Sequence, residues 1–546
     1  MPLNIDIYLM LMEHLESPSD ISALTRSCKT LCALGAKRLL LPGVTIRSDA
    51  DLVSFSRFML RDLAARSPHL RRLFLCIELQ RIDDDGSGSV YACDPEIIEE
   101  EMLEGGRLLY RVLRRATALE HLTIHFCEEL LEREDSLVDA LVALKNVRYL
   151  HISSYGLLTH EVIAEINSPL VHVNVDCYDG PSHDVHIAQT LARHRHTLEK
   201  LTVWHVNLMD MFVALDEEDD EIVFPHVHSL CIRSSLALDF AHLVDTFPNV
   251  RSLDVADVHL TGRLSPHDAS DLRDTNLDVT DGWRSLEHLC GDEWGLYILG
   301  LDRPVKRLDV EWDNSPQQWL DDPVFDARPT HFLLHGGFAP ESEPLFWDLP
   351  DTLVSASDSI THLGLDMCIN GLDEGVRVIM PLILDFIEAA DGLTFFALRL
   401  RALPLEEESA YAPDDHRYPT VPGLSSTTEI MLRDVGRRSW VCRIAESAPA
   451  LRYVSMDLEG HAPSYWKVCP AKQGSGRILV GPLDPEEGEA IVRAEGMEWR
   501  RREPQPPRFD EEEMVVRGVP AEEDEWAWTE ECVVSEDDSE SEDDSD

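Results

Sequence analysis

The sequence lacks the segments and motifs that mark membrane proteins, secreted proteins and common enzymes. No apolar run approaches the roughly 18 residues that span a bilayer. The first residues hold no basic segment followed by an apolar one, so we expect no secretory signal. There is no GxSxG, P-loop or HExxH motif, and no GxGxxG between a strand and a helix. We therefore expect neither an enzyme nor a bound cofactor.

Paired cysteines and metal-binding patterns are also missing. The twelve cysteines show no CxxC pairing, and Cys76 and Cys231 sit within strand-like apolar patterns. We expect reduced thiols in a cytoplasmic or nuclear protein. The histidines between His183 and His196 have no matching partner pair at metal-binding spacing. We interpret them as solvated surface histidines and expect no metal.

Positive charge is scarce. The chain has 48 Lys and Arg against 102 Asp and Glu, with a net charge of −54. The last 37 residues, from Asp510, hold 18 acidic residues and one basic residue, which leaves −37 on the remainder. This charge repels nucleic acid and anionic membranes and favours basic partners. It would equally well keep a large protein soluble, and both interpretations stay open.

Two amphipathic helical patterns occupy residues 3–34. The first has i, i+4 spacing, at Leu3, Ile7, Leu11 and Leu15. Residues 17–19 interrupt it, and Asp20 is a suitable N-cap for the second pattern. The apolar stripe of the second consists of Ile21, Leu24, Cys28, Leu31 and Leu34. A unit of about 40 residues is rarely stable alone, so it should pack on the rest of the chain or on a partner.

From about residue 68 a short phrase recurs, with apolar residues at its first, fourth and sixth positions. Clear copies begin at Leu70, Leu119, Val147, Leu170, Leu198, Val227, Val250, Val305, Ile360, Leu393 and Leu451. Weaker copies surround Leu286, Leu333 and Ile430. Alternating apolar residues predict a short strand with one buried face, which only stacked neighbouring copies can cover. The sequence therefore predicts an α/β solenoid with helical return segments.

Four polar stretches interrupt the repeats, at 81–95, 216–221, 265–281 and 405–422. They are rich in turn-forming or acidic residues and are interpreted as insertions.

The pattern changes after the last clear copy. Residues 477–480 predict a strand, and Asp484 begins a predicted helix that ends at Gly496. We interpret residues 461–504 as a terminal cap. Residues 505–546 are acidic and of low complexity, which predicts a disordered tail.

The spacing of residues 3–31 resembles that of the F-box, in register and without gaps. The matching positions are Leu3, Asp6, Ile7, Tyr8, Leu11, Met12, Leu15, Asp20, Ile21, Leu24, Cys28, Lys29 and Leu31. Asn4 stands where the family usually has Pro, Asp6 replaces Glu, Ser27 replaces Val, and Leu31 replaces a frequent Trp. The repeats resemble leucine-rich repeats in the irregular form common beside F-boxes, although their usual Asn or Cys is mostly missing.

This resemblance implies an α/β protein of four parts. They are an F-box-like helical domain at 1–46, an irregular leucine-rich-repeat horseshoe at 47–460, the cap at 461–504 and the tail at 505–546. The implied function is the substrate-recognition subunit of an SCF-type cullin–RING ubiquitin ligase, with no catalytic residue of its own. A Skp-type adaptor would bind Leu3, Ile7, Leu11, Leu15, Leu24, Cys28 and Leu31.

The horseshoe resemblance also implies where a target protein would bind. Polar positions beside the central apolar residue of each copy would face the concave surface. The candidates are His121, His125, Tyr149, His151, Asp176, Lys200, Trp204, Arg233, Asp309, Glu311 and Asp366. Tyr, Trp and Arg are typical interface anchors, but the exposed face of any strand is polar. The target is unidentified, and the charge of the chain favours a basic one.

The tail offers modification sites. Ser535, Ser539 and Ser541 are each followed by acidic residues and resemble sites of acidophilic kinases, where phosphorylation would add negative charge.

Two other functions fit the same sequence. The chain could be an interaction scaffold unrelated to ubiquitin, with its first helices as a structural cap. It could also be a chaperone-like binder of basic proteins that acts through the acidic tail.

Overall fold

The computed structural model describes residues 5–15, 18–25, 29–77, 95–177, 187–206, 222–233, 240–256, 266–280, 282–312, 318–338, 359–369, 375–390, 392–402, 436–469 and 478–499. Residues Met1–Met497 form one compact unit and Glu498–Asp546 a second. Three of the predicted insertions, at 81–94, 216–221 and 405–422, lie outside the described residues, as do the weak copy at Ile430 and the acidic tail.

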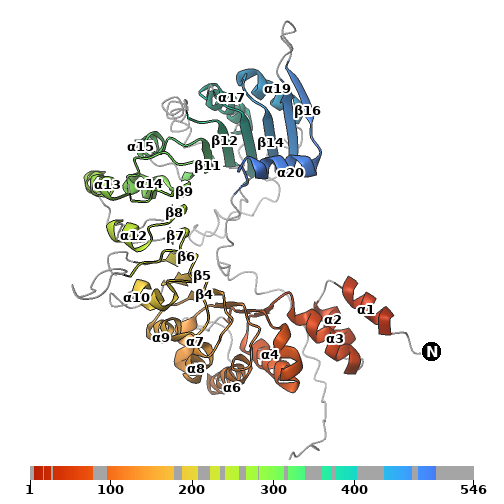
Figure 1. Ribbon diagram of the computed structural model, residues 1–546. Helices are drawn as coiled ribbons and strands as arrows, with labels where there is room; N and C mark the ends of the chain where they lie inside the picture. Colours follow the sequence, from red (N-terminus) through yellow and green to blue (C-terminus); the bar gives the residue numbers. More distant parts are fainter. Residues whose placement is uncertain are drawn as a thin grey trace, which may run out of the picture. The chain divides into compact units, whose positions relative to one another are not determined.

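The fold is mixed α/β, and the described residues of the first unit contain one open sheet of 16 strands that follow chain order (Figure 1). The strands are β1 (Val44–Ile46), β2 (Arg72–Leu75), β3 (His121–Ile124), β4 (Tyr149–Ser153), β5 (His172–Asp176), β6 (Lys200–Trp204), β7 (Ser229–Arg233), β8 (Ser252–Ala256), β9 (His288–Asp292), β10 (Arg307–Trp312), β11 (His331–Phe338), β12 (His362–Ile369), β13 (Phe395–Ala402), β14 (Tyr453–Leu458), β15 (Ser464–Cys469) and β16 (Leu479–Pro482). Pairing is parallel from β1 to β14. It is antiparallel from β14 to β16. This arrangement fits a solenoid.

The recurring phrase forms these strands, as predicted. Every clear copy supplies one strand between β2 and β14, and the weak copies near 286 and 333 supply β9 and β11. The central residue of β11 is Phe332, which pairs with Leu308 and Leu363. That copy is weak because Pro329 occupies its first position. Equivalent positions pair from strand to strand, so the spacing of the phrase sets the register.

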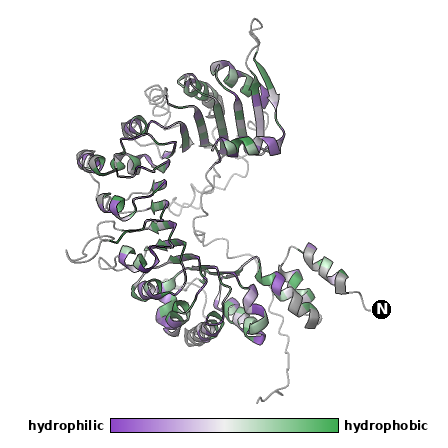
Figure 2. Cartoon of the chain, in the orientation of Figure 1, coloured by the Kyte–Doolittle hydropathy of each residue, from purple (hydrophilic) through white to green (hydrophobic). Residues whose placement is uncertain are grey.

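Helices occupy the segments between the strands. They are α4 (Asp49–Arg61), α5 (Leu63–Arg66), η1 (Ser67–His69), α6 (Pro95–Leu113), α7 (Cys127–Arg133), α8 (Ser136–Val142), α9 (Leu157–Glu165), α10 (Ile187–Leu191), η2 (Ala192–His194), α12 (Ala241–Thr246), α13 (Pro266–Thr280), α14 (Glu293–Leu299), α15 (Gln318–Ala327), α17 (Gly375–Glu388) and α19 (Arg437–Ser447). Their apolar residues and one face of the sheet form a continuous core that extends from Leu40 to Val468. Figure 2 shows that these helices carry both polar and apolar residues.

The prediction of a turn-rich insertion at 265–281 was wrong, because most of this stretch is helix α13. Its inner face includes polar residues that the apolar periodicity could not reveal. Arg273 donates to the Tyr297 carbonyl at 2.8 Å, and Asn276 donates to the Ile298 carbonyl at 2.9 Å. The helix therefore packs on α14 partly through hydrogen bonds from buried side chains.

Three helices precede the sheet, namely α1 (Ile5–His14), α2 (Pro18–Thr25) and α3 (Lys29–Leu40). Helix α2 packs on α3, and α3 packs on α5 and η1. Leu31 and Leu40 of α3 are buried. Strand β1 then pairs with β2, so the sheet begins within the segment 1–46 that the sequence assigned to the helical domain.

The predicted terminal cap contains the expected elements. Strand β16 overlaps the predicted strand at 477–480, and helix α20 (Pro485–Ala494) follows Asp484. The Asp484 carboxylate accepts a hydrogen bond from the Glu486 amide at 2.9 Å, which is the expected N-cap. Gly496 follows the helix with a φ of 69°, the left-handed conformation that ends many helices.

Candidate functional site

The face of the sheet opposite the buried apolar residues is termed the polar face, and its side chains form rows across the strands. The first row is Arg72, His121, Tyr149, His172, Lys200, Ser229, Ser252, His288, Arg307, His331, His362, Phe395 and Tyr453. The middle row includes His151, Thr202, Cys231, Asp254 and Asp309. The third row includes Ser153, Asp176, Trp204, Arg233, Glu311, His335, Asp366, Arg399 and Asp457.

Aromatic rings stack along the N-terminal part of the first row. The rings of His121 and Tyr149 lie 4.1 Å apart and nearly parallel, and the ring of His172 meets Tyr149 edge-on at 5.7 Å. Burial and the nearby Arg72 lower the pKa of His121, so its ring is neutral near pH 7. Tyr149 is 39% exposed. This exposed, partly stacked ring is the kind of anchor that protein interfaces use.

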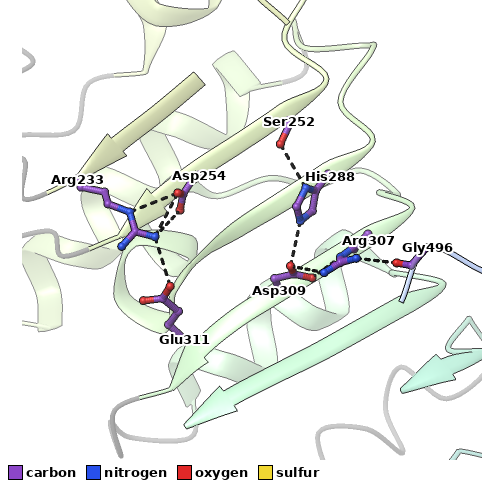
Figure 3. Close-up of polar contacts among 8 residues, drawn as sticks. All are labelled: Arg233, Ser252, Asp254, His288, Arg307, Asp309, Glu311 and Gly496. Atoms are coloured by element: carbon purple, nitrogen blue, oxygen red, sulfur yellow. Dashed lines mark hydrogen bonds and ion pairs between the residues drawn. The ribbon is translucent and has the colours of Figure 1, made fainter. Parts of the chain in front are cut away.

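The central strands carry an arginine held by two carboxylates (Figure 3). Arg233 donates to Asp254 at 3.2 Å and to Glu311 at 3.3 Å, and its guanidinium lies 5.4 Å from the centre of the Trp204 ring. The Cys231 thiol donates to the same Asp254 carboxylate at 3.0 Å. Only 11% of the Arg233 side chain is exposed, so these contacts stabilise the sheet and leave it little surface for a ligand.

The second polar cluster surrounds a fully buried carboxylate, Asp309 (Figure 3). Arg307 donates to its two oxygens at 2.7 and 2.8 Å, and His288 Nε2 lies 3.2 Å from Oδ2. Ser252 Oγ lies 3.2 Å from the other ring nitrogen of His288. Burial tends to raise the pKa of Asp309, but the hydrogen bonds from His288 and Arg307 outweigh it and hold the pKa below its usual range.

A third cluster surrounds Asp366 of β12. Arg401 donates to its carboxylate at 2.6 Å, and His335 Nδ1 lies 3.3 Å from the same oxygen. Arg399 lies 3.7 Å from Asp366 and donates to Asp457 at 2.8 Å. Burial tends to raise the pKa of Asp366, and the hydrogen bonds from His335 and Arg401 lower it overall. The Asp366 carboxylate is thus already neutralised within the protein.

The residues after α20, Glu495–Met497, lie on the first row and are termed the C-terminal segment. Arg307 donates to the Gly496 carbonyl at 2.6 Å, and His331 Nε2 lies 2.9 Å from the Glu495 carbonyl. His362 Nε2 lies 3.0 Å from the Glu495 carboxylate. Met497 is completely buried. The chain therefore occupies this part of its own polar face.

Helix α20 brings the C-terminal segment to this place. Gly488 lies so close to the Tyr465 ring of β15, on the polar face, that a side chain at this position would collide with the ring. A helix of 10 residues is about 15 Å long. This length is enough to cross the three strand spacings from β15 to β12, which amount to about 14 Å. In Figure 1 α20 accordingly runs from the β16 side of the sheet toward β11.

The rings of His331 and His362 stack beneath this segment, with their centres 4.0 Å apart. Burial and the neighbouring His362 lower the pKa of His331 to about 4. His331 is therefore neutral near pH 7. The stacked pair, the Arg307 guanidinium and the Glu495 carboxylate form one continuous contact between segments far apart in the sequence.

The structure places every target-binding candidate from the sequence on the polar face. The candidates fall into two groups by what surrounds them. Asp309 and Asp366 are buried in internal ion pairs, and Arg233 and Glu311 bind each other. His121, Tyr149, His151, Asp176, Lys200 and Trp204 keep part of their surface, whereas His125 is buried and lies 3.2 Å from Ser153 Oγ.

Sequence reasoning missed three histidines of the polar face, His288, His331 and His335. They lie on β9 and β11, which come from weak copies of the phrase. Aligning those copies on Leu289 and Phe332 would have placed them in the rows. No local signal could have shown that the C-terminal segment contacts His331.

The adaptor-binding candidates differ in exposure. Ile7 and Leu11 are 44% and 49% exposed on α1, and Met10 between them is 60% exposed. Leu15 and Leu24 are half-buried, and Leu31 is only 2% exposed, so Leu31 contributes to the interior. Leu3 and Cys28 lie outside the described residues.

Other predicted sites can be located only in part. His194 is buried and its Nε2 lies 3.1 Å from the Ile163 carbonyl, so it is a structural residue and not a surface histidine. His183, His186, Ser535, Ser539 and Ser541 lie outside the described residues. Within the ranges given above, no three His, Cys, Asp or Glu side chains are placed to hold a metal ion. No helix in that part is long and apolar enough to cross a membrane.

No model of a known protein family matches the chain, and no curated protein matches its sequence.

Proposed function

We propose that this protein is the substrate-recognition subunit of an SCF-type cullin–RING ubiquitin ligase. Its N-terminal helices dock on a Skp-type adaptor, and its leucine-rich-repeat solenoid holds a target protein. The protein supplies no catalytic group. It raises the effective concentration of target lysines near the ligase by holding the target in place.

The exposed apolar side chains of α1 carry this proposal. Ile7, Met10 and Leu11 lie within about one helical turn of one another and are all 44% exposed or more. Ile7 and Leu11 are also two of the positions at which the sequence resembles the F-box. Clustered exposed apolar residues mark contact sites for other proteins. A purely structural cap would have covered these side chains against the sheet or the neighbouring helices.

The polar face supports the second half of the proposal. Tyr149, His121 and Arg72 offer a ring stack next to an exposed guanidinium. Asp309 and Asp366 are used in internal ion pairs. We therefore assign target binding to strands β2–β6 and not to the whole face.

Co-purification of the full chain with a Skp-type adaptor tests the proposal. The double variant Ile7→Asp with Leu11→Asp should lose the adaptor, because two carboxylates would replace the apolar contact. The matched control is Leu157→Asp with Phe325→Asp, since those side chains are 72% and 60% exposed on α9 and α15. The control should bind the adaptor like the unchanged chain. If the unchanged chain fails to bind any Skp-type adaptor, the ligase function is wrong.

The alternative is an interaction scaffold with α1–α3 as a structural cap. The burial of Leu31 and the packing of α3 on α5 favour a structural role for α2 and α3. In that case the α1 double variant would bind the same partners as the unchanged chain, which distinguishes the two functions.

A further inference from the structure

A cavity of about 360 Å³ lies between the ends of α4 and α6, away from the polar face. Leu60, Leu63 and Tyr110 form its apolar part, and Arg111, Arg114 and Arg115 form its charged part. Its volume falls within the range of about 300–1,000 Å³ that small binding sites occupy. A cavity with three arginines and no carboxylate in its lining is unexpected in a chain with a net charge of −54.

The arginines at this cavity differ from those one or two turns earlier in the same helices. Arg57 of α4 pairs with Glu104 at 2.8 Å, and Arg107 of α6 pairs with Glu134 at 3.6 Å. Within the described part of the chain, Arg111 and Arg115 form no ion pair. Arg57 and Arg107 thus have counter-charges, whereas the lining of the cavity contains arginines and no carboxylate.

The nearby acidic residues do not fill this role. Asp62 lies between the two leucines in sequence, but its carboxylate accepts a hydrogen bond from the Ala65 amide at 3.4 Å, at the start of α5. The hydrogen bond to Tyr110 is the main cause that raises the pKa of Arg114, and Asp139 has the smallest effect. The Asp62 carboxylate is therefore engaged at the start of α5, and Asp139 acts only weakly on Arg114.

Tyr110 fixes one of the three guanidinium groups. Arg114 donates to the Tyr110 hydroxyl at 2.8 Å, and the guanidinium lies 5.7 Å from the centre of the ring. An arginine near a helix C-terminus is also stabilised by the helix dipole. That effect is confined to the last turn of the helix. It does not explain why Leu60 and Leu63 form an apolar surface beside the arginines.

We propose that this cavity is a docking site for an acidic peptide segment of a partner protein. Its aspartate or glutamate carboxylates pair with Arg111, Arg114 and Arg115 in charge-assisted hydrogen bonds. One apolar side chain of the segment packs on Leu60 and Leu63. Charge complementarity selects this partner, because the rest of the chain repels acidic segments. The site is independent of adaptor binding through α1.

Fluorescence anisotropy with the full chain tests this site. The probe is a labelled peptide that contains the sequence Asp-Glu-Leu-Asp-Glu, and its Asn-Gln-Leu-Asn-Gln counterpart is the uncharged comparison. The test variant is Arg111→Glu with Arg115→Glu. The control is Arg438→Glu with Arg443→Glu, which changes the net charge equally at two exposed arginines of α19. All four positions are exposed, so both variants should fold.

We expect the acidic peptide to bind the unchanged chain and the control with similar affinity, and the test variant about tenfold or more weakly. The uncharged peptide should not bind. Leu60→Ser, which changes a half-buried leucine of the cavity lining and no charge, should weaken binding by a smaller factor. The proposal is overturned if the acidic peptide does not bind, if both charge variants weaken it equally, or if inorganic phosphate binds and the peptide does not.

Discussion

The two halves of the strand array use the same row position in different ways. In the N-terminal half, Tyr149 stacks on His121 and remains 39% exposed. In the C-terminal half, His331 and Phe395 occupy the same row and are 7% and 1% exposed. There the C-terminal segment covers part of the row, and arginines neutralise the acids of the neighbouring rows.

This difference shows that an aromatic or charged residue on a strand face does not by itself indicate recognition. The same residue types build internal contacts in one half and remain partly exposed in the other. What separates the halves is whether another part of the chain returns to the face. Three predictions test this comparison, beginning with the largest effect.

Removing the buried carboxylate of the C-terminal half should be the most damaging change. Asp309→Ala removes the carboxylate that Arg307 and His288 share, and breaking a buried ion pair costs about 3–5 kcal/mol of unfolding free energy. Urea denaturation measures this loss. The control is Glu165→Ala, because the Arg193–Glu165 pair is 49% and 65% exposed and should contribute less than about 1 kcal/mol. Equal losses for the two variants would show that the Asp309 cluster contributes no more to stability than a surface ion pair.

Acidification should weaken the C-terminal half through His331. Its pKa is lowered to about 4 by burial and by His362, with Lys306 and Arg307 adding to the effect and the Glu495 carbonyl opposing it. The unfolded chain therefore takes up a proton near pH 6.5 that the folded protein does not. Stability is complete above that pH and falls as the pH drops toward 4, by about 2 kcal/mol between pH 6.5 and 5.

Unfolding of His331→Gln over the same pH range measures this contribution, since glutamine has no charge to gain. The variant should lose less stability than the unchanged chain on acidification. Parallel curves for the two proteins would mean that His331 does not sense pH in this range. Measurements should stay above the isoelectric point near 4.6, where the chain has no net charge to keep it soluble.

The smallest effect on stability is expected in the N-terminal half. Tyr149→Ala removes an exposed ring whose described contacts are the His121 and His172 rings, so it should cost about 1 kcal/mol or less. Target capture from cells, compared between the variant and the unchanged chain, should instead fall markedly. A large loss of stability in urea would place Tyr149 among the structural residues and remove the contrast between the halves.

The sequence alone determined the repeated strands, their register and the alternation of their faces. The phrase beginning at Leu70, Leu119 and Val147 predicted strands whose central residues pair directly, because apolar period two forces one face inward. The signals at Asp484 and Gly496 likewise predicted α20 and its end. These features are local, so short stretches of sequence contain all the information they need.

Only the tertiary structure decided what each face does. Helix α13 was not predicted because its buried side chains Arg273 and Asn276 are polar. They donate hydrogen bonds to carbonyls more than 20 residues away, and the apolar periodicity of the sequence does not reveal such contacts. The contact of Glu495 with His331 and His362 joins positions more than 130 residues apart in the chain. The sequence placed His121, Tyr149, Asp309 and Asp366 on one face. Burial and partners, which depend on where the chain returns, decided which of them remain available to another protein.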